Sequence, residues 1–261
     1  MTETISLVLR LAAPMQSWGT SSQFNRRATD DRPSKAGIVG LLACALGRDR
    51  GADVDDLTAL PMAVRVDQPG TVMVDYHTVS TFDGAPLLSS NTNAKGRQTS
   101  TGPAKRTHIN RRSYLHDAVF VVVLSGEREL LTQLAAALRH PTWALFLGRR
   151  SCPPAGPLLV AGPDGDLWTG GAADLLHTIP WQAGIAGRRE HRANDTVTLS
   201  ATIDDTAGMD LAQDVPTGFA PRQRGSRTRP VTHLWIDLPI SEHSTTAQLP
   251  HHDPFTALEA P

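Results

Sequence analysis

The amino-acid sequence predicts an α+β protein with a ferredoxin-like (RRM-like) β-α-β-β-α-β core. Two helical segments each lie between apolar strand-like segments, and a long polar arm separates the second strand from the third. Apolar residues make up 40% of the 261 residues, which is enough for a substantial core. We expect a single domain over residues 1–240, with the arm inserted at about residues 80–117.

The first half of the core is predicted from residues 5–80. Apolar residues alternate along residues 5–11, which is typical of a strand. Residues 34–47 begin with a serine suited to capping a helix and end with a glycine suited to terminating one. Residues 62–67 and 71–80 are strand-like, and the Gln-Pro-Gly sequence between them predicts a tight turn.

The second half of the core begins with residues 118–124, which are apolar throughout and indicate a central strand. Residues 127–138 have the spacing of an amphipathic helix, with a proline just beyond it. Residues 143–147 are expected to form the fourth strand.

The C-terminal part is predicted to be a smaller β-rich region that completes the fold. Residues 196–203 and 231–238 are its strand-like segments. Residues 241–261 are rich in Ser, Thr, His and Pro without periodicity, so we expect a disordered tail.

The arm is the most unusual segment in its charge. Between Asp83 and Asp117 lie thirty-three residues without a carboxylate, although the whole chain has a net charge of only −1. Six cationic residues occur in it: Lys95, Arg97, Lys105, Arg106, Arg111 and Arg112. Such a segment favours contact with a polyanion, and a disordered surface loop is the alternative.

Four further groups of basic residues lie outside the arm. They are Arg26, Arg27, Arg32 and Lys35; Arg149 and Arg150; Arg188, Arg189 and Arg192; and Arg222, Arg224, Arg227 and Arg229. The first group flanks the start of the first predicted helix, where free backbone N–H groups favour a phosphate. Each group alone is equally compatible with a solvated surface.

Signatures of catalysis are weak. The sequence has no HExxH motif, no GxSxG elbow and no Walker loop, and we expect no metal site and no cofactor. Cys44 and Cys152 are isolated, and no signal peptide or membrane span is visible, so a cytoplasmic protein is expected. Lys105, His108 and Tyr114 could supply metal-independent RNA cleavage, but each is also an ordinary RNA contact, and binding is the favoured interpretation.

Four sequence blocks resemble the family of CasD subunits of Cascade, the type I-E CRISPR surveillance complex. They are residues 9–19 (LRLAAPMQSWG), 33–47 (PSKAGIVGLLACALG), 114–120 (YLHDAVF) and 147–154 (LGRRSCPP), in the order expected for that family. No equally clear match follows about residue 157. The four blocks together are far more specific than any one of them.

The resemblance implies a non-catalytic protein that binds the 5′ handle of CRISPR RNA and caps one end of a backbone filament. It implies contacts with the backbone subunits and with the large subunit that reads the protospacer-adjacent motif, and thus an indirect role at target DNA. The arm would be a thumb. The related type I-C subunit cleaves precursor RNA, which keeps a metal-independent endoribonuclease as the alternative.

The predicted RNA-binding residues lie in the resembling blocks, in the loop after the first strand and in the arm. They are Gln16, Ser17, Trp18, Arg26, Arg27, Lys35, Lys105, Arg106, His108, Arg111, Arg112, Tyr114, Arg149, Arg150 and Ser151.

Overall fold

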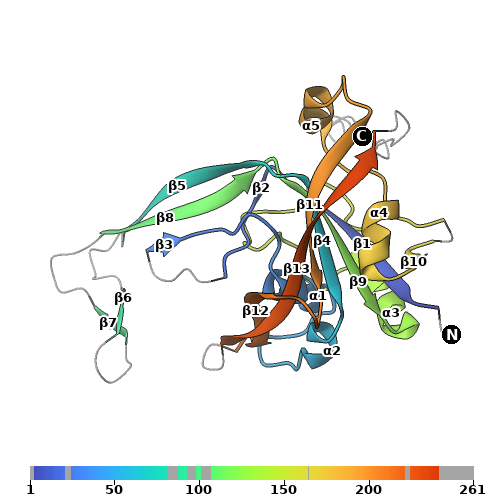
Figure 1. The fold of residues 1–261 in the computed structure, drawn as a ribbon. Coiled ribbons are helices and arrows are strands. Elements are labelled where there is room, and N and C mark those ends of the chain that lie inside the picture. The colour runs from blue at the N-terminus through green and yellow to red at the C-terminus, as the bar shows by residue number, and fades with distance from the viewer. Residues whose placement is uncertain are drawn as a thin grey trace, which may run out of the picture.

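The computed structural model describes residues 3–20, 25–80, 88–92, 98–100, 107–163, 165–220 and 224–240. Its body is a seven-stranded sheet with the order β10-β1-β9-β4-β11-β13-β12, in which every neighbouring pair is antiparallel (Figure 1). The strands are β1 (Ile5–Ala12), β4 (Met62–Gln68), β9 (Val119–Gly126), β10 (Leu167–Thr169), β11 (Thr196–Asp204), β12 (Asp210–Gly218) and β13 (Gly225–Pro239). The protein is therefore a mixed α and β structure built mostly from antiparallel strands.

Helices cover the sheet on both faces. They are α1 (Lys35–Ala45), α2 (Asp55–Thr58), α3 (Arg128–Arg139), α4 (Ala172–Thr178) and α5 (Ile185–Glu190). On β1, Leu7 and Leu9 pack into the core that contains α1 and α3, whereas Val8 packs into a second core that contains α4. Both faces of β1 are buried because side chains alternate across a strand and each face has its own cover. Within the described ranges, no helix has the length and apolar character needed to cross a membrane.

The predicted strands at 5–11, 62–67 and 118–124 are confirmed, as are both predicted core helices. The strand predicted at residues 143–147 is wrong, because these residues form irregular structure. Leu147 is fully buried, and its N–H group donates to the carbonyl of Cys152 in a compact loop. The strand that pairs with β1 on the side away from β9 is β10 instead.

The C-terminal strands do not form a separate region, since β11 pairs with β4 and extends the same sheet. Strands β11 and β13 confirm the segments predicted there, but β12 was not predicted. Its sequence contains Pro216 and several polar residues, a composition tolerated at the edge of a sheet, where β12 lies. The predicted tail, residues 241–261, lies outside the described residues.

The polar arm is based on a two-stranded ribbon that leaves the body of the protein (Figure 1). Strand β5 (Thr71–Ser80) pairs with β8 (Thr107–His116) from its first residue to its last, and β6 (Leu88–Thr92) pairs with β7 (Gln98–Ser100). The segment predicted as a core strand at 71–80 is thus half of the ribbon. The chain leaves β4 at Gly70, whose φ of +69° suits glycine, and a Cβ there would lie 2.5 Å from the carbonyl oxygen of His116.

A buried ion pair on β4 fixes α4 and the segment after it, which cover the second face of the sheet. The side chains of Arg65 and Asp67 on β4 are both 0% exposed, with Nε and Oδ1 2.7 Å apart. Arg65 also donates to the carbonyl oxygens of Leu176, Ile179 and Pro180, and an Oδ2 of Asp67 accepts the N–H of Gln182. These two residues of the sheet therefore fix the end of α4 and the chain that follows it.

We predict that Arg65→Met destabilises the protein by about 3–5 kcal/mol, because it leaves a buried carboxylate without its partner. Urea unfolding followed by circular dichroism measures this change. Asp166→Asn, which breaks the surface pair between Arg139 and Asp166, is the matched control and should cost far less. Equal losses in the two variants would contradict the prediction.

Candidate nucleic-acid interface

Segments distant in the sequence meet at the base of the ribbon and bring arginines together. Strand β3 (Arg26–Arg27) runs parallel to β8, with Arg26 opposite Arg111 and Arg27 opposite Arg112. Arg26, Arg27 and Arg111 are exposed, and Arg112 is half-buried with its Nε 3.0 Å from the Oδ1 of Asn110. Like charges on paired strands repel, and although Asp75 on β5 lies opposite Arg112, the pairing gathers positive charge at a surface that favours an anionic partner.

Arg149 holds this pair of strands in place. Its Nη1 donates to the carbonyl oxygen of Ser113 on β8 at 3.0 Å, and its Nη2 donates to those of Arg27 at 3.0 Å and Ala28 at 3.2 Å. Its guanidinium also lies over the ring of Tyr114, 4.8 Å from the centroid. The planar guanidinium group can donate to several acceptors at once. Arg149 therefore positions the two strands and also adds a positive charge to the site.

The next two residues complete this corner. Arg150 and Ser151 are exposed, and the Oγ of Ser151 lies 3.4 Å from the phenol oxygen of Tyr114. Tyr114 itself is 2% exposed. Arg150 and Ser151 therefore reach solvent, whereas Tyr114 lies beneath Arg149.

A close backbone approach joins this corner to the chain after β1. The N–H group of Ser17 donates to the carbonyl of Leu147 at 3.2 Å, and the Oγ of Ser17 donates to that of Ser113 at 3.3 Å. Gly148 has φ +83°, and a Cβ at this position would lie 1.6 Å from the carbonyl oxygen of Ser17. Only glycine allows the two backbones to come this close. Ser17 is buried by the same approach.

Gln16 and Trp18 are inside the protein rather than on this surface. Gln16 belongs to β2 (Met15–Gln16), and its Nε2 donates to the carbonyls of Leu11 at 3.2 Å and Ala118 at 2.7 Å. Its Oε1 accepts from the Nε1 of Trp18 at 3.1 Å. The two side chains are 0% and 1% exposed, so we assign them a structural role in place of the predicted contact with RNA.

Lys35 is likewise committed to contacts inside the protein. Its Nζ lies 2.8 Å from Asp204, and its backbone N–H donates to Asp214 at 2.7 Å. Arg229 binds both of these carboxylates. The start of α1, predicted to hold a phosphate, is thus occupied by a carboxylate of the protein itself, because a helix N-terminus attracts any anion.

Two other arginines predicted from sequence clusters are partly exposed but make contacts within the protein. Arg188 donates to the carbonyls of Ala183 and Trp181 and lies over the Trp181 ring, and Arg32 forms a bidentate pair with Asp31. Burial lowers the pKa of Arg188, and the Asp67 charge opposes that shift.

The remaining predicted residues belong to the arm. Lys105 and Arg106 lie outside the described residues, and at His108 only the backbone of β8 is described. The described residues contain no group of three or more His, Cys, Asp or Glu side chains placed to hold a metal ion.

Comparisons with known proteins agree on the family. The family model for CRISPR-associated Cas5 proteins matches residues 6–232. The Cascade subunit CasD of the CRISPR system of Escherichia coli (strain K12) is 34% identical over 169 residues, which cover 59% of this chain and 69% of that protein.

Two solved structures are similar along almost the whole chain. A chain of a CRISPR RNA-guided surveillance complex superposes with a TM-score of 0.68 at 33% identity, covering 90% of this chain and 91% of that one. A crystal structure of a Cas protein superposes with a TM-score of 0.64 at 35% identity, covering 90% and 95%. The resemblance in the four sequence blocks is confirmed, and the chain belongs to the Cas5 family of CRISPR-associated proteins.

Proposed function

We propose that this protein is a non-catalytic subunit of a Cascade-type CRISPR surveillance complex that binds the 5′ handle of CRISPR RNA in the cytoplasm. The observation that carries the proposal is the parallel pairing of Arg26–Arg27 with Arg111–Arg112 at the base of the ribbon. Its similarity to CasD and to a chain of an RNA-guided complex supports the choice of RNA as the anion.

The architecture proposed for this function is a ferredoxin-like core carrying a thumb, in a single domain over residues 1–240. The order β10-β1-β9-β4, with α1 and α3 on one face, supports the core. The ribbon of β5 and β8 is the proposed thumb, and it includes the ten residues of β5 as well as the arm.

The RNA contacts are assigned to exposed and partly exposed groups. Arg26, Arg27, Arg111 and Arg112 bind phosphates, and Arg150 and Ser151 extend the same surface. Arg149 acts by fixing the backbone between them. Lys105, Arg106 and His108 stay predicted contacts of the thumb.

The partners proposed within the complex are the backbone subunits and the large subunit that reads the protospacer-adjacent motif, with target DNA bound indirectly. Val72, Val74 and Tyr76 share one face of β5 and are 66%, 58% and 56% exposed. An apolar stripe of this kind on a ribbon suits contact with another protein. This face supports the capping of one end of the backbone filament.

We predict that replacing Arg26 and Arg111 together by Ala weakens binding of a repeat-derived handle RNA and reduces its salt dependence. Each phosphate contact with a single strand contributes about −0.7 to the slope of log K against log salt, so the double variant should lose about 1.4 from the slope. Fluorescence anisotropy at several salt concentrations measures it.

Arg192→Ala is the control for this experiment, because Arg192 is an exposed arginine beyond α5, outside the site. It should leave the slope unchanged. An unchanged slope in the double variant, or equal binding to an unrelated RNA, would count against the proposal.

Arg149→Lys tests positioning separately from charge. A lysine keeps the cation but lacks the planar fork that joins Ser113, Arg27 and Ala28, so we expect a stability loss of about 1–3 kcal/mol together with weaker RNA binding. Arg192→Lys, at an exposed arginine outside the site, should change neither the melting temperature nor the affinity. The prediction would be contradicted by an Arg149→Lys protein that behaves like Arg192→Lys.

The alternative function, metal-independent cleavage of precursor RNA, is disfavoured by the burial of Tyr114 under Arg149. We predict that precursor repeat RNA stays intact when it is incubated with the purified protein in a chelator. Denaturing gel electrophoresis detects any product. Specific cuts that disappear in His108→Ala or Tyr114→Phe would establish the alternative.

A further inference from the structure

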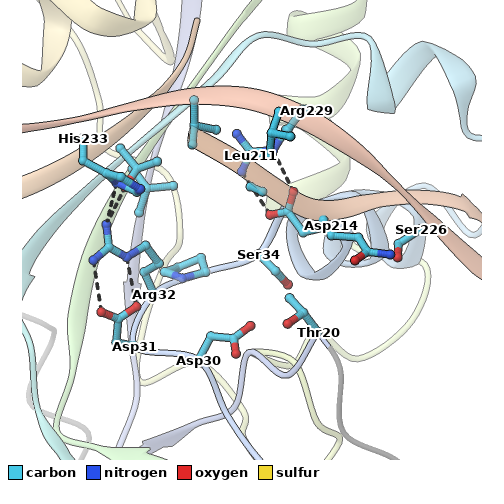
Figure 2. Close-up of a pocket in the computed structure, with 16 residues that line it drawn as sticks. Thr20, Asp30, Asp31, Arg32, Ser34, Leu211, Asp214, Ser226, Arg229 and His233 are labelled. Atoms are coloured by element: carbon cyan, nitrogen blue, oxygen red, sulfur yellow. Dashed lines mark hydrogen bonds and ion pairs between the residues drawn. The ribbon is translucent and has the colours of Figure 1, made fainter. Parts of the chain in front are cut away.

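A cavity of about 610 Å³ lies between the loop before α1 and the C-terminal strands (Figure 2). The loop contributes Asp30, Asp31 and Ser34, and β12 and β13 contribute Leu211, Asp214 and His233 among others. Its volume is in the range of about 300–1,000 Å³ that is typical of pockets for small ligands. It is distinct from the paired arginines at the base of the ribbon.

Two of its three carboxylates are saturated by the protein. Both oxygens of Asp31 accept from Arg32, at 2.9 and 3.0 Å. Both oxygens of Asp214 accept from Arg229, at 2.7 and 3.0 Å, and Oδ2 also accepts from the backbone of Lys35. These two carboxylates already have cationic partners and need none from outside.

Asp30 differs from both. Its side chain points toward Ser34 and Thr20 in Figure 2, and among the described residues none of the ion pairs near the cavity includes Asp30. Burial raises the pKa of its carboxyl group, hydrogen bonds with Thr20 oppose that shift, and the charges of Asp31 and Asp214 add to it. The ionised form of Asp30 is therefore short of positive charge in this structure.

The charge balance around the cavity points the same way. Four carboxylates, those of Asp30, Asp31, Asp204 and Asp214, lie with three fixed cations, those of Arg32, Lys35 and Arg229. Among these described groups, one negative charge is left without a partner. A phosphate would be repelled, whereas a ligand with a single positive charge would balance the cavity.

The apolar residues that line the cavity indicate that the remainder of such a ligand is apolar. Pro33, Val64, Leu211 and Val231 line the same space. A cation on an alkyl stem can place its stem against these side chains and its head at the carboxylate. A bare metal ion would leave the apolar side chains without a contact.

We propose that this cavity binds an alkylguanidinium or alkylammonium group, with Asp30 as its counter-ion. The N–H groups of the ligand donate to the carboxylate of Asp30, and the hydroxyl groups of Ser34 and Thr20 are the neighbouring polar atoms. Two sources have this chemistry: an arginine or lysine side chain of an adjoining protein, and a free small cation. The site does not depend on the proposed RNA contacts.

Isothermal titration of the full-length protein with butylguanidine, an alkylguanidinium with one positive charge, tests the site directly. We expect one saturable site in the wild type and binding at least about tenfold weaker in Asp30→Asn, because a charge-assisted hydrogen bond is lost. Asp174→Asn removes an exposed carboxylate on α4 and should bind butylguanidine like the wild type.

A second variant blocks the space while keeping the charge. Leu211 is 70% exposed and lines the cavity, so the Leu211→Trp variant should fold normally but fail to bind butylguanidine. Circular dichroism confirms that each variant is folded. The proposal is overturned if the wild type shows no saturable binding, if Asp30→Asn binds equally well, or if the uncharged donor guanosine competes as strongly as butylguanidine.

Purification of the native assembly then distinguishes the two sources. If Asp30→Asn lowers recovery of one protein subunit while the amount of bound RNA is unchanged, the cation is a side chain of that subunit. If the composition of the assembly is unchanged although butylguanidine binding is lost, the ligand is a free cation. Failure of RNA binding alone would bear on the proposed function and not on this site.

Discussion

The buried ion pair between Arg65 and Asp67 is the interaction on which the second face of the sheet depends. Arg65 donates to three carbonyl groups, one in α4 and two just after it, and Asp67 accepts from the backbone of Gln182 and pairs with Arg65 through both oxygens. Without these bonds, backbone groups of α4 and of the segment after it would be buried without hydrogen-bond partners. The pair thus fixes an irregular segment against the centre of the sheet.

The neighbouring Gln68 connects the segment after α4 to the ribbon. Its Nε2 donates to the carbonyl of Asp117 at 2.5 Å, and its Oε1 accepts the N–H of Gly184 at 3.0 Å. Asp117 directly follows β8, so the end of β4 is bonded both to the segment after α4 and to the base of the ribbon. The arginines of β8 are presented from a base tied to the core, and Arg149 then holds β3 beside them.

Arginine in this chain serves two opposite purposes that look alike in the sequence. Arg65, Arg149 and Arg188 use their donors on backbone carbonyls, whereas Arg26 and Arg111 are exposed on paired strands. A cluster of basic residues predicts only that charge is present nearby. Whether that charge faces solvent depends on carbonyls and carboxylates supplied by distant segments, which is why the start of α1 was predicted as a phosphate site.

The sequence by itself determined three strands and both helices of the core, because hydrophobic periodicity and capping are local, and four blocks in the order of the family were enough to indicate it. It also located the arginines of the candidate site in the arm and in the loop after β1. Only the tertiary structure decided that Gln16, Trp18 and Lys35 are internal and that β11 joins the main sheet. These outcomes depend on pairing between residues far apart in the chain, which no local pattern encodes.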